Sequence, residues 1–239
     1  MSVPGVDPGM LEDLAAASRI LVDQGVFDAA GHVSMRHPGH TDRFLMSRSL
    51  APEMIQADDL MEFDLDCNAI DARERNGFIE RYLHGEIYRA RPDVMAVAHS
   101  HSPSVIAFSI SNRPMRAMYH NAAFLAAGVP VFDIREKFGA TDIVISTAAK
   151  GAALAEVLAD KHVALLRAHG MVAVGPSLAV AVFRAIFTVA SAHIQHQALA
   201  LGGPLSPLDA EEGRLADVVN VQTVGRAWDL WKKRVMKAS

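Results

Sequence analysis

Apolar residues recur along this chain at two spacings, which predict a series of alternating helices and strands. Leu11, Leu14 and Leu21 share one face of a helix predicted at residues 10–24, which Gly25 ends. Further helices are predicted at 78–90, from Pro103, at 150–160, from Ser177, and over a C-terminal segment from about 209 that Asp209 caps.

Short apolar runs between turn signals predict strands, at residues 31–36, 43–47, 61–65, 94–99, 129–133, 163–166 and 171–174. Helices and strands interleave over the whole length, which indicates one α/β or α+β layered domain spanning residues 1–239. The strands are short and mixed in pattern. They favour a mostly antiparallel central sheet over a doubly wound parallel one.

Composition narrows the kinds of partner and site. The net charge of −4 gives no basic field, so we expect no nucleic-acid partner. Cys67 is the one cysteine among 239 residues, which excludes an intramolecular disulfide and a cysteine zinc cluster. Eleven histidines remain, so a transition-metal site would depend on imidazole and carboxylate ligands.

Two segments bear on location. Residues 1–9 lack the basic and apolar regions of a signal peptide. The apolar stretch 178–201 contains Arg184, His193 and His196, which indicates a buried or interfacial helix rather than a membrane span. We therefore expect a soluble, cytoplasmic protein with no membrane partner.

Three histidines are candidate metal ligands. His99 and His101 are two residues apart, so in a strand both rings project from one face and reach one ion. A chance pair of this kind is common in a chain with eleven histidines. His169 follows the apolar run 163–166 and precedes Gly170, at a strand end where active-site groups often lie. The alternative is a hydrogen-bonded core histidine.

Glu80 lies near the start of the helix that precedes the His99 strand. Its carboxylate is a candidate fourth ligand, a candidate acid/base group, or simply a favourable charge in a first helical turn. His84 follows one turn later on the same face. The sequence leaves these roles open.

Taken together, several segments resemble the class II aldolase/adducin family over about residues 11–208. The matching segments are 31–34, 43–47, 57–60, 80–88, 92–101, 165–170 and 172–175. The resemblance implies that His99, His101 and His169 bind one divalent cation, for which zinc and manganese are the first choices, and that Glu80 is an acid/base carboxylate beside it. It also implies an α/β fold of three αβα layers and a homotetramer with active sites between subunits.

The departures from the family pattern concern the substrate. Phe78 and Ile79 stand where sugar-phosphate aldolases carry hydroxyl residues that hold the phosphate, and neither side chain can donate a hydrogen bond. His32 replaces an asparagine, and the usual Ser-Gly of the next loop is Ser49-Leu50. His120 corresponds to a tyrosine that donates a proton in some of these aldolases.

Segments 80–86, 101–105 and 129–135 are similar to the aromatic-acid decarboxylases of this superfamily, notably 3-hydroxy-2-methylpyridine-4,5-dicarboxylate decarboxylase of vitamin B6 breakdown and dihydroxyphthalate decarboxylases. The resemblance implies a metal-dependent decarboxylase of a hydroxylated aromatic or pyridine dicarboxylate. His120 or Glu80 would supply the proton, with His120 favoured by its near-neutral intrinsic pKa.

Ser49 and a cationic clamp drawn from Arg48, Arg81 and Arg135 would bind the substrate. The alternative is an aldolase acting on an unphosphorylated hydroxy-ketoacid. A non-catalytic adducin-like module would not need the three histidines together with Glu80, and an iron oxygenase usually has two histidines and one carboxylate.

Overall fold

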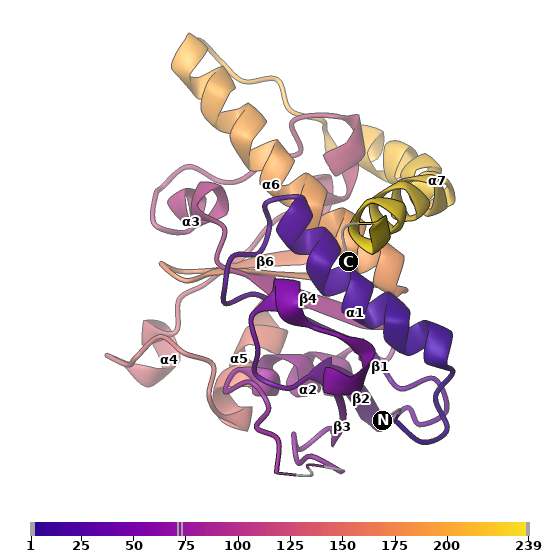
Figure 1. Cartoon of the computed structure of the whole chain (residues 1–239). Helices are drawn as coiled ribbons and strands as arrows, with labels where there is room; N and C mark the ends of the chain where they lie inside the picture. The colour runs from indigo at the N-terminus through magenta and orange to yellow at the C-terminus, as the bar shows by residue number, and fades with distance from the viewer. Residues whose placement is uncertain (1–2, 71, 73, 238–239) are drawn as a thin grey trace.

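The computed structural model describes residues 3–70, 72 and 74–237, and one seven-stranded sheet lies at its centre (Figure 1). Its strands are β1 (His32–Arg36), β2 (Arg43–Ser47), β3 (Leu60–Asp64), β4 (Ala96–Ser100), β5 (Val131–Phe132), β6 (Val163–Leu166) and β7 (Gly170–Gly175). Their order is β3-β2-β1-β4-β7-β6-β5, and each pairing is antiparallel except that of β5 with β6. The predicted mostly antiparallel sheet is confirmed.

Helices cover both faces of this sheet. They are α1 (Pro8–Asp23), α2 (Arg81–Ala90), α3 (Pro103–Ser109), α4 (Arg135–Phe138), α5 (Ala148–Leu158), α6 (Leu178–Leu201) and α7 (Ala210–Lys237), with short 3-10 segments η1 (Pro52–Met54), η2 (Ala57–Asp59) and η3 (His120–Ala127). Figure 1 shows α1, α6 and α7 on one side of the sheet and α2 and α5 on the other. The predicted three-layer αβα architecture is confirmed.

Side-chain alternation along β4 decides which layer receives the first candidate ligand. Ala96 and Ala98 pack into the core beneath α1 and α6, whereas Val97 packs into the separate core beneath α2 and α5. Because successive residues of a strand point to opposite faces, His99 projects to the same side as Val97. The strand therefore presents His99 to the layer that contains α2.

Several predicted boundaries differ from the structure by one to three residues, and two of these differences have a clear cause. The helix expected at 78–90 begins at Arg81, because residues 78–80 form the turn that carries Phe78 and Glu80. The strand expected at 129–133 is reduced to Val131–Phe132. Pro130 has no N–H to donate to a ladder, which shortens this edge strand. At the C-terminal segment, Asp209 Oδ1 accepts from the N–H groups of Glu211 and Glu212, as predicted for a cap.

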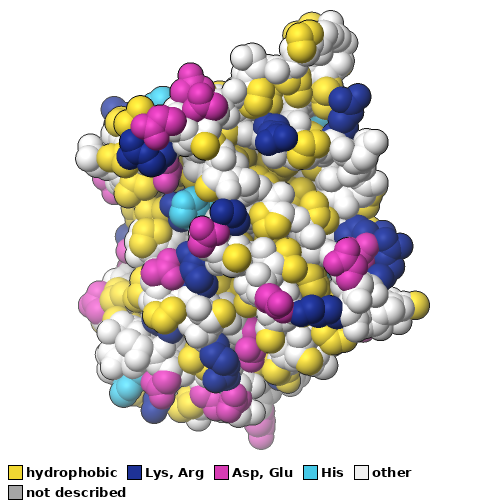
Figure 2. Space-filling view, turned by 180° about the vertical axis from the view of Figure 1, so that it is seen from behind, with side chains coloured by type: hydrophobic (Ala, Val, Ile, Leu, Met, Phe, Trp, Pro, Cys, Tyr) yellow, Lys and Arg dark blue, Asp and Glu magenta, His cyan; other side chains and the backbone are white. Residues whose placement is uncertain are grey.

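The apolar helix α6 is, among the described residues, the one long and apolar enough to cross a membrane. In this fold 67% of its apolar window is buried inside the protein, which is usual for the core helix of a soluble protein. The face in Figure 2 carries acidic and basic side chains interspersed, without a continuous basic patch. The helix α6 is thus mostly buried, as the sequence predicted for this apolar stretch. Residues 1 and 2, which belong to the segment compared with a signal peptide, lie outside the described residues.

His162, just before β6, gives a test of how burial affects stability. Its Nδ1 is buried with no hydrogen-bond partner among the described residues. Burial, followed by the charges of Arg184 and Arg91, lowers the pKa of His162 to about 4. The native side chain therefore stays neutral in the pH range where the unfolded chain, with a histidine pKa near 6.5, already binds a proton.

The native state should thus lose stability as the pH falls from about 6.5 to 4, and His162→Gln should remove this contribution. The difference in unfolding free energy between parent and variant should change by at most about 1.4 kcal/mol per pH unit across that window. Urea unfolding of both proteins at several pH values between 4 and 8 measures it. Two stability curves that run parallel over the whole range would contradict the assignment.

Candidate functional site

Four side chains from separate parts of the chain converge beside the end of β4. His99 is on β4, His101 follows that strand, His169 precedes β7, and Glu80 is the residue before α2. Each offers one ligand atom, and these four atoms all lie within 4.8 Å of one another. The three histidines and the glutamate singled out in the sequence are therefore one cluster.

The distances in this cluster fit a single small cation. His101 Nε2 lies 3.0 Å from His99 Nε2 and 3.0 Å from His169 Nε2. Glu80 Oε2 lies 3.4, 3.5 and 3.8 Å from the Nε2 atoms of His99, His169 and His101. Four ligand atoms about 2.1 Å from one ion at tetrahedral corners would be about 3.4 Å apart. The residues present thus fit a divalent transition metal.

A close backbone contact brings His169 to the other two histidines. A Cβ atom on Gly170 would come within 1.9 Å of the Ser100 carbonyl oxygen, so any residue with a side chain would push β7 away from the end of β4. The preceding Ala168 has φ 55°, a left-handed conformation that turns the chain ahead of His169. Gly170 is required for this approach.

Hydrogen bonds outside the cluster orient two of its members. His99 Nδ1 lies 3.0 Å from the Met171 carbonyl oxygen. Nδ1 therefore carries the proton, and the lone pair of Nε2 faces the cluster. Glu80 Oε1 accepts from the Ile145 N–H at 2.9 Å, which leaves Oε2 directed at the three imidazoles. Both residues are held as ligands before a metal arrives.

The electrostatics agree with this preorganisation. His99 is fully buried, and burial lowers its pKa although the Glu80 carboxylate opposes the shift. Burial on its own would raise the pKa of the Glu80 carboxyl. The three imidazoles that face its Oε2, His99 first, outweigh burial and lower that pKa well below its usual range. At neutral pH the cluster has a neutral His99 and an ionised carboxylate, which are the protonation states that metal binding needs.

A pocket of about 420 Å³ opens beside this cluster. Glu80 and His101 form one part of its wall, and His32 and Ser49 are the other polar residues that line it. The remaining lining residues are apolar, namely Ala29, Ala30, Leu50, Ala51, Phe78 and Ile79. The volume and the few polar groups are typical of a small-molecule site. The walls suit a flat apolar ring better than a phosphate dianion.

Comparison with known proteins identifies the fold family. Residues 12–196 match the family described as Class II Aldolase and Adducin N-terminal domain. The chain belongs to the class II aldolase/adducin family. Among its relatives, decarboxylase tropJ of Talaromyces stipitatus is 34% identical, with 98% of this chain and 96% of the relative covered. The 3,4-dihydroxyphthalate decarboxylase of Arthrobacter keyseri is 29% identical over 94% of this chain and 93% of its own length.

Solved structures agree with the family assignment at the level of fold. An aldolase II superfamily protein from Pseudomonas syringae superposes with a TM-score of 0.83 at 24% identity, covering 99% of this chain and 96% of that one. An L-fuculose 1-phosphate aldolase from Glaciozyma antarctica gives a TM-score of 0.79 at 22% identity, covering 97% and 90%. These likenesses show the class II aldolase fold.

Of the predicted substrate-binding residues, Ser49 lines the pocket beside the cluster and the three arginines do not. Arg48 pairs with Asp59 through Nε at 2.7 Å, and Arg135 is exposed and paired with Asp133. The Arg81 guanidinium donates to the carbonyls of Cys67 and Phe78 and to the Tyr82 hydroxyl. None of the three arginines is among the lining residues, and their role in substrate binding stays a prediction.

His120 is not part of the cluster or of the pocket wall described above. It is exposed at the start of η3, where its Nδ1 lies 3.3 Å from Asn121 Oδ1 and its carbonyl accepts from Asn220. Sequence analysis predicted this histidine to be the proton donor. That role also stays a prediction.

Sequence reasoning gave no role to four buried polar residues next to the cluster, His32, Ser34, His84 and Tyr88. Two signals could have found them. His32 and Ser34 are two residues apart on a strand, and His84 and Tyr88 are four apart on a helix, so each pair shares one face. Burial, followed by the charge of His99, lowers the pKa of His84 to about 3, so this ring is neutral.

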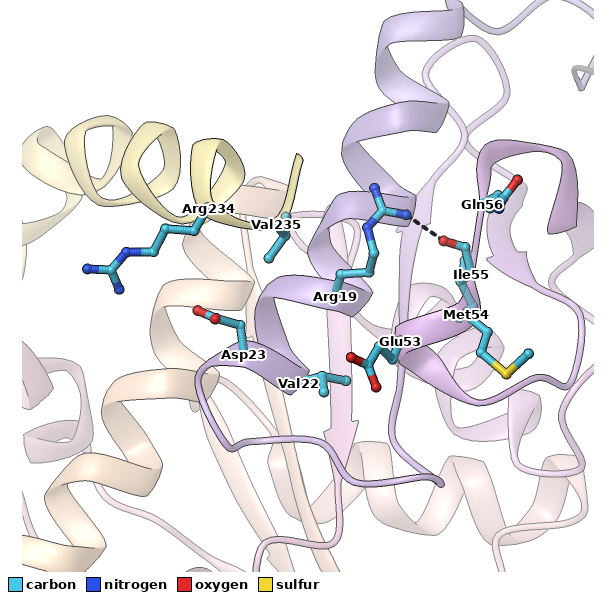
Figure 3. A pocket seen from close by; sticks show the side chains of 9 residues that line it. All are labelled: Arg19, Val22, Asp23, Glu53, Met54, Ile55, Gln56, Arg234 and Val235. Atoms are coloured by element: carbon cyan, nitrogen blue, oxygen red, sulfur yellow. Dashed lines mark hydrogen bonds between the residues drawn. The ribbon is translucent and has the colours of Figure 1, made fainter. Parts of the chain in front are cut away.

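A second pocket lies between α1, η1 and the end of α7 (Figure 3). Its wall combines Arg19 and Arg234 with Asp23 and Glu53, and Arg19 donates to the Ile55 carbonyl at 2.6 Å. It has no histidine among its lining residues. Charges of both signs without a histidine favour a surface cleft over a catalytic site.

Proposed function

We propose that this protein is a metal-dependent decarboxylase of a hydroxylated aromatic carboxylate. One observation carries the proposal: a cluster of three imidazoles and one carboxylate lies beside a pocket whose walls are mainly apolar. The decarboxylase relatives, which this chain matches over nearly its full length, support the same reaction class. A cytoplasmic homotetramer is the form in which we expect it to act.

The residues divide the work as follows. His99, His101 and His169, together with Glu80, would hold one divalent cation, zinc or manganese, which supplies Lewis-acid stabilisation of negative charge on the substrate. Phe78, in the pocket wall, would orient the ring and exclude water. The ionised Glu80 carboxylate is suited to accept the proton of the substrate hydroxyl. Loss of carbon dioxide leaves a ring carbon that takes up one proton, for which His120 is the predicted donor.

The predicted substrate preference follows from the pocket wall. Phe78 and Ile79 provide no hydrogen-bond donor for a phosphate group, and no lysine or arginine is among the residues that line this pocket in the described chain. Desolvation of a phosphate dianion there would go uncompensated. We therefore expect aromatic acids, whose departing carboxylate would face the cation, to be processed in preference to sugar phosphates. A second carboxylate on the ring would need the predicted arginine clamp.

The test loads the purified protein with zinc or manganese and measures carbon dioxide release. The substrates to offer are 3,4-dihydroxyphthalate and 3-hydroxy-2-methylpyridine-4,5-dicarboxylate, with L-fuculose 1-phosphate as the comparison compound. We expect release of one carbon dioxide per aromatic acid consumed, loss of activity with a chelator, and recovery with added metal. Aldehyde formed from an unphosphorylated hydroxy-ketoacid, without carbon dioxide from any aromatic acid, would favour the aldolase alternative.

A further inference from the structure

A continuous chain of short hydrogen bonds runs from the pocket into the core beneath the sheet. His32 Nδ1 lies 2.8 Å from His84 Nε2, His84 Nδ1 lies 2.7 Å from Ser34 Oγ, and Ser34 Oγ lies 2.7 Å from the Tyr88 hydroxyl. All four residues are at most 2% exposed. The metal cluster described above uses none of them as a ligand.

The Tyr88 hydroxyl determines which atom donates in each of these hydrogen bonds. Among the described residues, Ser34 Oγ is the acceptor that this buried hydroxyl reaches, and an unsatisfied buried donor is costly. Tyr88 therefore donates to Ser34. Ser34 has one hydroxyl proton, which is then free to be donated to His84 Nδ1.

The same order of donors and acceptors fixes which nitrogen of His84 and of His32 carries the proton. A neutral histidine has one donor nitrogen and one acceptor nitrogen. Since His84 accepts at Nδ1, it donates from Nε2 to His32 Nδ1. His32 then carries its own proton on Nε2. In the reverse arrangement His84 would donate to Ser34 Oγ, one of the two hydroxyl protons of Ser34 and Tyr88 would have no acceptor, and His32 Nε2 would present a lone pair.

His32 ends the chain at the substrate pocket. It lines that pocket, and its ring lies 5.0 Å from the ring of His99 and 4.7 Å from the ring of Phe78, measured between centroids. The described residues give its Nε2 no hydrogen-bond partner, whereas its Nδ1 is paired with His84. A proton on Nε2 would be available to a molecule bound in the pocket.

We propose that Tyr88, Ser34 and His84 hold His32 as the Nε2–H tautomer, so that His32 donates a hydrogen bond to an anionic oxygen of the bound substrate. His32 is thus a substrate-binding residue, and the other three are positioning residues. A carboxylate or a phenolate oxygen would accept this bond, whereas a lone pair on His32 Nε2 would repel either. The ligand class depends on the proposed decarboxylase function, but the tautomer does not.

The proton positions can be measured without any activity. Neutron diffraction from deuterium-exchanged crystals of the whole protein should show deuterium on His32 Nε2, on His84 Nε2, and on Ser34 Oγ pointing to His84. Deuterium on His32 Nδ1 pointing to His84 would overturn the proposal. This result is independent of whether carbon dioxide release is found, so failure of the function and failure of the tautomer assignment can be told apart.

Kinetics of three variants test the effect on the substrate. His32→Phe should raise KM about ten- to hundredfold with a smaller change in kcat, because a hydrogen bond to a charged group is lost. His32→Gln, whose amide can place an N–H near the position of Nε2, should recover most of that loss. Tyr88→Phe removes the hydroxyl that sets the direction and should raise KM about three- to tenfold.

His193→Phe is the matched control for His32→Phe, since His193 is an exposed histidine of α6 outside the pocket wall and the chain of hydrogen bonds. We expect its KM to equal that of the parent. Circular dichroism should show native folding for each variant that is compared. Equal KM values for the parent, a folded His32→Phe and a folded Tyr88→Phe would refute the role of His32 in substrate binding.

Discussion

The His101→Ala variant is expected to keep its fold and to lose roughly a thousandfold in turnover, because Lewis-acid stabilisation contributes several kcal/mol and each 1.4 kcal/mol is about tenfold in rate. His101 Nε2 lies 3.0 Å from the corresponding atoms of both other histidines, so its removal opens the centre of the cluster. Its side chain is 25% exposed, compared with 0% for His99. Truncation of His101 therefore disturbs the core less than truncation of His99 would.

Three measurements belong together in this test: metal content after dialysis, carbon dioxide release at saturating substrate, and the thermal midpoint. We expect the variant to bind less than a tenth of the metal of the parent at equal free metal. His193→Ala is the matched control, since His193 is an exposed histidine of α6 outside the cluster. A His101→Ala protein with full metal content and full turnover would remove the cluster from the mechanism.

The spacing of His99 and His101 predicted two imidazoles on one face of a strand, whereas the roles of His169 and Glu80 came from the resemblance to the class II aldolase/adducin family. In the structure, the antiparallel register of β4 with β7 pairs Ser100 with Met171, which brings His169 to the end of β4. A ligand at a strand end is thus fixed by the backbone. The same logic did not extend to loops, since contacts such as that of Ile145 N–H with Glu80 depend on segments 65 residues apart.

The start of α2 shows how a tertiary contact overrides a local pattern. Apolar spacing placed the helix start at Phe78, yet residues 78–80 form a turn, and Glu80 makes no side-chain cap to the helix. Its carboxylate instead points to the three histidines. A helix beginning at Phe78 would place Glu80 within regular helical geometry rather than at its edge. Local propensity cannot report such a competing contact.

The hydrogen bonds behind the pocket could not be predicted from the sequence, for a different reason. The spacing of His32 with Ser34, and of His84 with Tyr88, was visible in the sequence as two faces. That the two faces meet requires knowing that α2 packs under β1, which no local signal gives. Pairing of distant elements is therefore the information that the structure adds.

Glu80→Gln is expected to lower turnover by about 10²- to 10⁴-fold even at saturating metal, the range for loss of a general acid or base. The substitution preserves shape but not the pattern of donors and acceptors. If the Gln oxygen accepts from the Ile145 N–H as Oε1 does now, its NH₂ group faces the three Nε2 atoms. An amide nitrogen has no lone pair to offer a cation. Metal affinity should therefore also fall, by about tenfold or more.

Glu80→Asp separates the two roles that the sequence left open. It retains the negative charge but is one methylene shorter, so it cannot span the 2.9 Å contact with Ile145 and the 3.4 Å approach to His99 together. We expect Asp to bind the metal more tightly than Gln while remaining at least about tenfold slower than the parent. If metal titration restored full turnover to both variants, Glu80 would be a ligand only, and the proton of the substrate hydroxyl would need another acceptor. At saturating metal, turnover that the Asp variant retains in part and the Gln variant loses identifies the ionised carboxylate as the base.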